Sequence, residues 1–269
     1  MVMPRFLYKY ESLNVQSLKN LKSQVLYFGS PLKFNDPYDC AIRPNIRQPS
    51  DPDVEKIRSH YLSDSDVSAN MRQAFLQSSV DELRGNFLRA GRQATEKTVE
   101  EFLKNRGATC FSERNDDLLM WSHYGERYQG ICLEFSTSFE PFHLAKKVSY
   151  RSDIPAVDLV RMLCNDDYDE ALNLFFTKST SWAYEQEWRC IHNVAGTAFT
   201  YKTESLTGVY FGPDIGAEML EIVCLILAGQ NETVKLWSGA RSPSEFKVVF
   251  EPFTYASHLE AKRQGLSGA

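Results

Sequence analysis

The chain has 269 residues, of which 43% are hydrophobic and 24% are charged, and its formal net charge is −5. This composition is typical of a folded globular protein and excludes a largely disordered chain. The acidic balance gives no overall attraction to nucleic acid or to anionic membranes, although it does not exclude local basic patches. No run of eighteen apolar residues occurs, so no transmembrane helix is expected.

The six cysteines are scattered along the chain, and no Cys-x-x-Cys pair is present. This pattern is typical of reduced, buried thiols rather than of a disulfide framework. The first residues, MVMPRFLYKYESL, lack the continuous apolar core of a secretion signal. Together these features predict a cytoplasmic protein. The usual zinc signatures are missing from the sequence, and no metal site is predicted.

The first fifty residues combine short strand patterns with one helix. Residues 5–10 and 24–28 are rich in apolar and aromatic residues and are predicted as strands, with a helix opening near Ser12 between them. From residue 51 to about 106, charged and polar residues dominate, and Leu76, Val80, Leu83 and Phe87 follow the spacing of an amphipathic helix. We expect a helical insertion here, packed on one side of a sheet, within one domain that spans residues 1–269.

Beyond residue 107 the chain returns to strands. A short helix capped by the residues NDD is predicted around LLMWSHYG, and further helices are expected over much of 155–177 and after Pro213. Strands are predicted at 108–112, 130–135, 147–150, 187–193, 206–211, 222–228 and 246–252. Because the strands do not alternate regularly with helices, the pattern favours an α+β fold over a doubly wound parallel sheet.

The segment WAYEQEWR, residues 182–189, is the strongest candidate for a functional centre. If residues 185–190 are extended, Glu185, Glu187 and Arg189 share one face. Successive carboxylates would then be about 6.5 to 7 Å apart, from a rise of roughly 3.3 Å per residue. Two carboxylates this close raise each other's proton affinity unless a cation intervenes, and Arg189 is placed to be that cation. Such a pair can bind a sugar hydroxyl and orient a nucleophile; the alternative is a structural ion pair.

Aromatic residues are concentrated in two other segments, the first forty residues and the MWSHYG helix. Aromatic faces can sandwich a nicotinamide or adenine ring, and a rigid loop with Ser30 and Asn35 offers hydrogen bonds. The alternative is that these aromatic residues only fill a core.

Four segments, in this order, resemble the signature of a bacterial family: LYKY, LYFGSPLKFNDPYDC, CFSERNDDLLMWSHYGERYQGICLEF and KSTSWAYEQEWR. The family is called domain of unknown function 2971, and the resemblance spans residues 7 to about 211. That family looks like a distant branch of the ADP-ribosyltransferase superfamily. The resemblance therefore implies a split β-sheet core that binds NAD in a cleft.

Three elements of that superfamily are implied, in sequence order. A His or Arg on an early strand holds NAD, a Ser or aromatic residue lines the nicotinamide pocket, and a Glu hydrogen-bonds the ribose and steadies an oxocarbenium-like transition state. By resemblance, Glu187 is the catalytic carboxylate and Glu185 its partner. The first strand, RFLYKY, has no His, and Arg5 precedes its expected inward positions. Tyr8, Lys9 or Tyr10 would then be the anchor, and Ser30 or the region of Tyr27 would be the second element. Trp121 and Tyr124 would close the pocket. Arg189 and Asn35 are the further residues expected to contact NAD.

The resemblance thus implies an NAD-dependent ADP-ribosyltransferase that modifies RNA, DNA or protein, as a bacterial toxin or phage-defence effector with an antitoxin or chaperone as partner. Two alternatives stay open from the residues. One is a non-catalytic module that binds a nucleotide or nucleic acid in the same cleft. The other is a metal-dependent phosphodiesterase or nuclease that uses His123 and the carboxylates.

Overall fold

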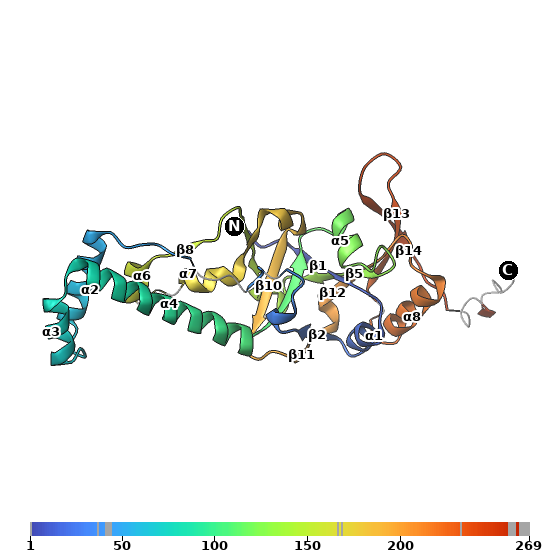
Figure 1. Cartoon of the computed structure of the whole chain (residues 1–269). Helices are drawn as coiled ribbons and strands as arrows, with labels where there is room; N and C mark the ends of the chain where they lie inside the picture. Colours follow the sequence, from blue (N-terminus) through green and yellow to red (C-terminus); the bar gives the residue numbers. More distant parts are fainter. Residues whose placement is uncertain are drawn as a thin grey trace. The chain divides into compact units, whose positions relative to one another are not determined.

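The computed structural model describes residues 2–36, 38–40, 45–165, 167, 169–231, 233–257 and 262–263. The chain divides into two compact units (Figure 1). Unit 1 comprises residues 1–29, 107–148 and 181–269, and unit 2 comprises residues 30–106 and 149–180. The mixed helix and strand content, with a large mixed sheet, confirms the α+β class. The single-domain organisation stays a prediction. None of the described helices has the length and apolar character needed to cross a bilayer.

Unit 1 is built around an eight-stranded sheet with the strand order β14-β13-β12-β5-β1-β4-β10-β6. Neighbouring strands are antiparallel, except that β12 and β13 run parallel. The bounds are β1 (Phe6–Glu11), β4 (Gly107–Ser112), β5 (Ile131–Ser136), β6 (Lys146–Lys147), β10 (Glu187–His192), β12 (Leu206–Phe211), β13 (Lys235–Arg241) and β14 (Val248–Phe253). A separate two-stranded sheet joins β2 (Val25–Phe28) and β11 (Thr197–Thr200).

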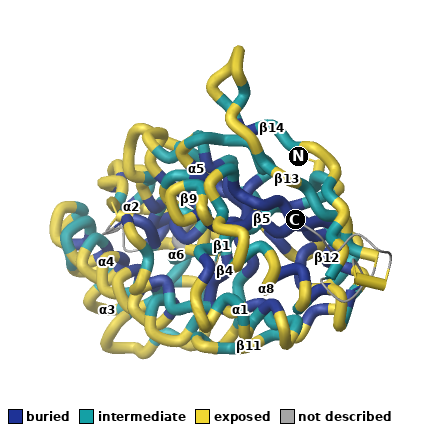
Figure 2. The backbone as a smooth tube through the Cα atoms, turned by 90° about the vertical axis from the view of Figure 1, so that its right-hand side faces the viewer, coloured by how far each residue is buried: buried dark blue, intermediate teal, exposed yellow. Residues whose placement is uncertain are grey.

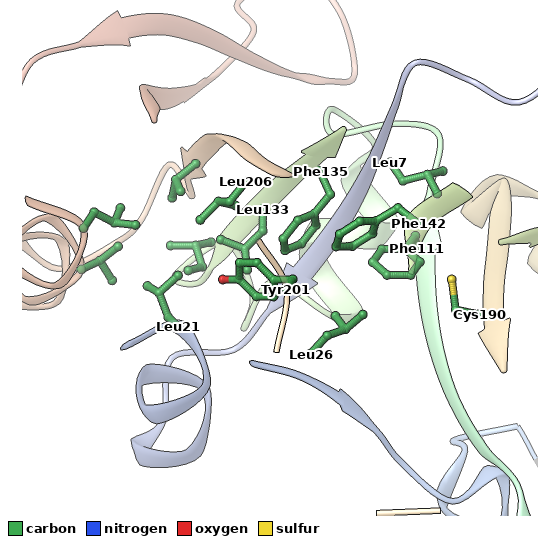
Figure 3. Close-up of a cluster of buried hydrophobic side chains, with 14 of the residues drawn as sticks. Leu7, Leu21, Leu26, Phe111, Leu133, Phe135, Phe142, Cys190, Tyr201 and Leu206 are labelled. Atoms are coloured by element: carbon green, nitrogen blue, oxygen red, sulfur yellow. The ribbon is translucent and has the colours of Figure 1, made fainter. Parts of the chain in front are cut away.

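One face of the large sheet carries the main apolar cluster of unit 1 (Figure 3). Alternate residues of neighbouring strands supply it, because successive side chains of a strand point to opposite faces; they include Leu7, Phe111, Leu133, Trp188 and Val209. Helices α1 (Val15–Lys22) and α8 (Ala217–Ala228) complete the cluster with Leu21 and Val223. In Figure 2 buried positions follow β5 and β12, whereas the hairpin between β13 and β14 projects into solvent with Phe246 98% exposed.

The prediction of a strand over residues 222–228 is wrong, because these residues form the second half of α8. Val223, Cys224 and Leu227 are the buried residues of that helix. Their spacing of one and three places them on a single side of a helix, where they meet the sheet. The run EIVCLILA suits both structures by propensity, and packing decides between them. Strands β11 and β13 were not predicted, because polar and small residues interrupt the alternation of apolar residues in their sequences.

Unit 2 is mainly helical, and its helices confirm the predicted helical character of residues 51–106 (Figure 1). A serine caps each of the first three helices, since the Ser50, Ser68 and Ser79 side chains accept backbone N–H bonds of the first turn. The helices are α2 (Asp51–Ser63), α3 (Ala69–Gln77), α4 (Val80–Asn105), α6 (Leu159–Asn165) and α7 (Asp169–Asn173). Short parallel pairs join β3 (Asn45–Ile46) to β8 (Ala156–Val157) and β7 (Ser149–Arg151) to β9 (Thr177–Ser179).

The predicted apolar stripe of unit 2 is shorter than its spacing indicates. Leu83 and Phe87 are buried with residues of α2 and α6. Leu76 does not join them, because it belongs to α3 and is 67% exposed. The cap at Ser79 separates the two helices, so the heptad-like spacing runs across a helix break.

We expect Gly212→Ala to lower the free energy of unfolding by about 3 kcal/mol, the upper part of the usual cost of overpacking. Gly212 follows β12, and a Cβ there would lie 2.1 Å from the Tyr128 carbonyl oxygen and 3.0 Å from that of Gly130. These are backbone atoms, which cannot rotate away. The measurement is urea unfolding followed by circular dichroism.

Gly216→Ala is the matched control for this substitution. No atom lies within 4 Å of a Cβ at Gly216, which has an ordinary φ of −70° at the N-cap of α8. A change below about 1 kcal/mol is expected, because alanine is only a poorer N-cap than glycine. Equal losses for the two alanine variants would contradict the close approach at Gly212.

Candidate functional site

A row of four side chains crosses the sheet on the face opposite the main apolar cluster. Glu134 of β5 pairs with Tyr8 of β1, Tyr8 pairs with Ser112 of β4, and Ser112 pairs with Glu187 of β10. Directly paired residues of neighbouring strands point to the same face. We call these four residues the tyrosine–glutamate row, and the side of the sheet that carries them the row face. With strands about 4.8 Å apart, the Cα atoms of Glu134 and Glu187 are roughly 14 Å apart.

One end of the row is a buried carboxylate surrounded by hydroxyl groups. The Thr207 hydroxyl donates to Oε1 of Glu134, and the Tyr210 hydroxyl donates to Oε2, both at 2.7 Å. The rings of Tyr8 and Tyr210 meet edge to face with centroids 6.0 Å apart. Burial raises the pKa of the Tyr8 phenol well above its ordinary value, and the charge of Glu134 and a hydrogen bond to it add to the rise. The phenol therefore keeps its proton at neutral pH.

The other end of the row is a buried ion pair. The Arg189 guanidinium donates from Nε to Oε1 of Glu187 and from Nη2 to Oε2, the second bond at 2.9 Å. Arg189 is fully buried and Glu187 is 3% exposed. Burial, followed by the charge of Glu187, raises the pKa of the Cys110 thiol, which is paired with Arg189 across β4 and β10. The arrangement fixes an ionised carboxylate in one orientation by a fork of two charge-assisted bonds.

Glu185 does not share the strand with Glu187, so the prediction of an extended segment from residue 185 is wrong at its first two residues. Residues Thr180–Glu185 form the 3-10 helix η4, and Gln186 has a left-handed φ of 44° before β10 begins at Glu187. A left-handed residue breaks the alternation of faces. The predicted alternation holds from Glu187 onward, since Trp188 belongs to the opposite, apolar cluster. The carboxylate of buried Glu185 instead accepts a 2.7 Å bond from the Tyr124 hydroxyl.

An aromatic group lies around this Glu185–Tyr124 contact. Helix α5 (Leu118–His123) begins at its cap Asp117, as the NDD motif predicts. The ring of His123 lies 6.2 to 6.4 Å from the rings of Tyr124, Trp182 and Tyr184. The group supplies flat faces and one imidazole beside a buried carboxylate, which is a combination able to hold a planar ring.

Two predicted pocket residues are packed into the second apolar cluster of unit 1. Trp121 is fully buried, and its indole N–H donates to the Asn115 carbonyl at 2.7 Å. Tyr10 lies edge to face against it, with its hydroxyl donating to the Arg114 carbonyl at 3.0 Å. Their polar atoms are thus satisfied by backbone within the fold, and the structure gives both residues a packing role.

None of the other predicted binding residues is a member of the row. Lys9 is on the opposite face of β1, where it forms an ion pair with Glu11 at 3.4 Å. Tyr27 lies on β2 and is 47% exposed. Ser30 and Asn35 belong to unit 2, and the Ser30 side chain caps the short helix η1 (Pro31–Lys33). Of the predicted residues, the structure therefore brings Tyr8 into one row with Glu187, whose carboxylate is bound by Arg189.

Sequence reasoning missed two members of the row, Ser112 and Glu134, and their neighbour Tyr210. The available signal was a carboxylate inside the apolar strand GICLEF, where a charge is costly unless it is satisfied. Ser112 gave less signal, because a serine at the end of a strand is common. Both are assigned to the row only through strand register, which depends on pairing between distant parts of the chain.

Comparison with known proteins gives one match. Residues 120–190 match the model of a family described as a protein of unknown function (DUF2971). The matched segment contains Glu134, Glu187 and Arg189, whereas β1 with Tyr8 lies outside it. No curated protein and no solved structure matches the chain.

Proposed function

We propose that unit 1 binds NAD on the row face and transfers ADP-ribose to a macromolecule. The observation that carries the proposal is the alignment of Tyr8, Ser112 and Glu187 on three adjacent strands. These three residues follow one another along the chain as an anchor, a serine and a glutamate. The resemblance to ADP-ribosyltransferases implies the same order. Ser112 takes the place first expected of Ser30, because it lies between the other two elements.

The chemistry required of this face is stabilisation of positive charge. The glycosidic bond between ribose C1′ and the nicotinamide nitrogen breaks, and its electron pair leaves with nicotinamide. The acceptor nucleophile then bonds to C1′ and loses its proton to solvent. While the ribose carries positive charge, the Glu187 carboxylate lowers its energy and accepts a ribose hydroxyl bond, and Arg189 keeps that carboxylate ionised and oriented.

Access to the row is a condition of this proposal. Ser112 is fully buried and Glu187 is 3% exposed. NAD can therefore contact Glu187 only after a local opening of unit 1, and opening of this kind commonly limits turnover in enzymes. The same proposal includes a role as a toxin or phage-defence effector, with an antitoxin or chaperone as partner. The acceptor of ADP-ribose is RNA, DNA or protein.

We expect Glu187→Gln to reduce nicotinamide release from NAD by roughly 10³-fold, the usual effect of removing a group that acts mainly on the transition state. The assay uses the full chain with NAD labelled in the adenylate phosphate and a cell lysate as acceptor source. It measures free nicotinamide and label in the protein and nucleic-acid fractions. Glu185→Gln, measured in parallel, separates the two candidate carboxylates.

Glu221→Gln is the matched control, because this carboxylate of α8 accepts only a surface bond from Tyr255 among the contacts described for it. Its turnover should equal that of the wild type. Melting curves accompany every variant, since Glu187→Gln also removes the charge that the buried guanidinium of Arg189 binds. Wild-type turnover in a folded Glu187→Gln protein would overturn the proposal. If calorimetry shows that the wild type binds NAD but no nicotinamide is released, the protein is a binding module rather than an enzyme.

A further inference from the structure

We propose that the β12–β13 end of the row face binds the adenylate half of NAD, with Lys235 on a phosphate and Trp237 beside the adenine ring. That the ligand is NAD rests on the proposed function. The inference adds a second contact region for the same molecule, open to solvent and distant from the buried Glu187. A ligand of this region combines a flat ring with an anionic group, as a nucleotide does.

Strand register continues the tyrosine–glutamate row beyond Glu134 onto the next two strands. Glu134 pairs with Gly208 of β12, and Gly208 pairs with Lys235 of β13. Because paired residues of neighbouring strands share a face, Lys235 lies on the row face. It is five strand spacings, roughly 24 Å, from Glu187. The row thus runs from a buried carboxylate to an exposed lysine, and an extended dinucleotide together with these two side chains covers the distance.

The aromatic surface beside Lys235 is formed by two parallel rings. Tyr210 pairs with Trp237 across β12 and β13, and their ring centroids are 5.7 Å apart with an angle of 5° between the planes. Tyr210 is buried and held in place, because its hydroxyl donates to Glu134 at 2.7 Å. Trp237 is only half-buried and lies two residues from Lys235 on the same strand, so both side chains are on one face. The sheet therefore presents an ordered indole ring and an ammonium group next to each other.

Lys235 and Trp237 offer hydrogen-bond donors and no acceptor. Within the part of the chain that the structure describes, Lys235 forms no ion pair and the indole N–H of Trp237 forms no hydrogen bond. The carboxylate of the row closest to them, that of Glu134, already accepts bonds from the Thr207 and Tyr210 hydroxyls. Donors of this kind select a ligand rich in acceptor oxygens, and lysine supplies the charge that favours phosphate. The indole ring adds stacking with a base.

The exposed position of this region bears on how NAD reaches the buried end of the row. Ser112 and Glu187 are buried, whereas Lys235 is exposed. Binding of the adenylate half therefore needs no opening of unit 1. Once NAD is held there, the meeting of its nicotinamide ribose with Glu187 becomes an intramolecular step, which raises the effective concentration of the reactive group.

The test compares NAD with nicotinamide mononucleotide, which has the same reactive bond but no adenylate half. Lys235→Met and Trp237→Leu should each raise the KM for NAD about tenfold, the effect of one charge-assisted bond or one stacked base, and should change kcat less than about twofold. Neither variant should alter nicotinamide release from the mononucleotide. Calorimetry with AMP as the probe should show the same weakening, about tenfold in Kd.

Lys202→Met and Phe246→Leu are the matched controls. Lys202 is an exposed lysine of unit 1 that follows Tyr201 of the main apolar cluster, and Phe246 is 98% exposed on the β13–β14 hairpin. Both variants should bind AMP and turn over NAD as the wild type does. Trp237→Phe carries the test if Trp237→Leu does not fold, since it keeps a ring against Tyr210. It removes only the N–H and should raise the KM for NAD about threefold.

The outcomes separate the two proposals. If the wild type releases nicotinamide and the Lys235 and Trp237 variants keep its KM for NAD, this inference alone is overturned. Equal losses with NAD and with the mononucleotide would also overturn it, because a contact to the adenylate half affects only the longer substrate.

If the wild type releases no nicotinamide, the proposed function fails and the binding of AMP decides the inference by itself. Binding that is about tenfold weaker in Lys235→Met and unchanged in Lys202→Met supports a nucleotide site. Absence of AMP binding, or equal binding in all variants, rules that site out.

Discussion

Replacing Arg189 by methionine is expected to lower the free energy of unfolding by about 3–5 kcal/mol, the usual cost of leaving one member of a buried ion pair alone. Arg189 is fully buried, and Glu187 beside it is 3% exposed. Methionine fills much of the arginine stem's volume but gives Glu187 neither a charge nor donors. The carboxylate then loses both bonds that it accepts from the guanidinium. Urea unfolding at pH 7 measures the loss.

Two further variants show whether the loss comes from the unpaired charge. Combining Arg189→Met with Glu187→Leu removes both charges and should recover most of the lost stability, because a buried pair replaced by apolar residues is often neutral or better. Arg241→Met breaks the surface pair with Asp214 and should leave the unfolding curve nearly unchanged. If Arg189→Met unfolds like the wild type, the guanidinium is not buried against Glu187, and the geometry of this end of the row is wrong.

Raising the pH above about 9 is expected to destabilise the protein steeply and to unfold it by about pH 11. Burial raises the pKa of four thiols, to about 12 for Cys190 and Cys224 and well above the ordinary value for Cys110 and Cys132. It also raises the pKa of the phenols of Tyr8, Tyr10, Tyr201 and Tyr210. These groups lose protons in the unfolded chain at lower pH than in the folded protein.

The sign follows from those raised values. The stabilisation is complete below the unfolded pKa, near 9 for thiols and 10 for phenols, and it is lost as pH rises toward the folded pKa. Each group contributes about 1.4 kcal/mol per pH unit in that range. Four thiols give a slope of roughly 5.5 kcal/mol per pH unit above pH 9, and four phenols bring it to roughly 11 above pH 10. Urea unfolding at several pH values from 8 to 10.5 measures the slope.

Tyr201→Phe is the variant that tests this assignment. Tyr201 is 4% exposed, and its hydroxyl has no hydrogen-bond partner among the described residues. The substitution should reduce the slope above pH 10 by about 1.4 kcal/mol per pH unit, since it removes one titrating group. Tyr27→Phe alters a ring that is 47% exposed and should leave the slope unchanged. Equal slopes in all three proteins would contradict the retention of the Tyr201 proton.

The sequence predicts the local part of the site well and its long-range part poorly. Alternation correctly separates Glu187 from Trp188, because every second residue of a strand faces the same way. It fails at Gln186, whose left-handed φ has no signal in the residue type. The helices of residues 51–106 are evident from serine caps and polar composition, yet the break at Ser79 is hidden by a spacing that crosses it.

The row itself could not be predicted, because it joins residues that are far apart in the chain. Tyr8 and Glu134, for example, are 126 positions apart. Pairing of this kind depends on which strands become neighbours and in what register, and a shift of one residue would move every side chain to the other face. The sequence placed Ser30 among the expected binding residues, whereas strand register places Ser112 in the row. The run EIVCLILA illustrates the same limit, since only its packing distinguishes helix from strand.

The division of the chain has a consequence for how the protein is made. Unit 1 takes its residues from three separate stretches, and the last of them begins at residue 181. On the ribosome, β1, β4 and β5 emerge long before β10 and β12, which flank them in the finished sheet. The nascent chain therefore carries a three-stranded core with both edges open until its last third is synthesised. Such edges template pairing with other chains, so we conclude that the growing polypeptide is most prone to aggregation before β10 and β12 have emerged.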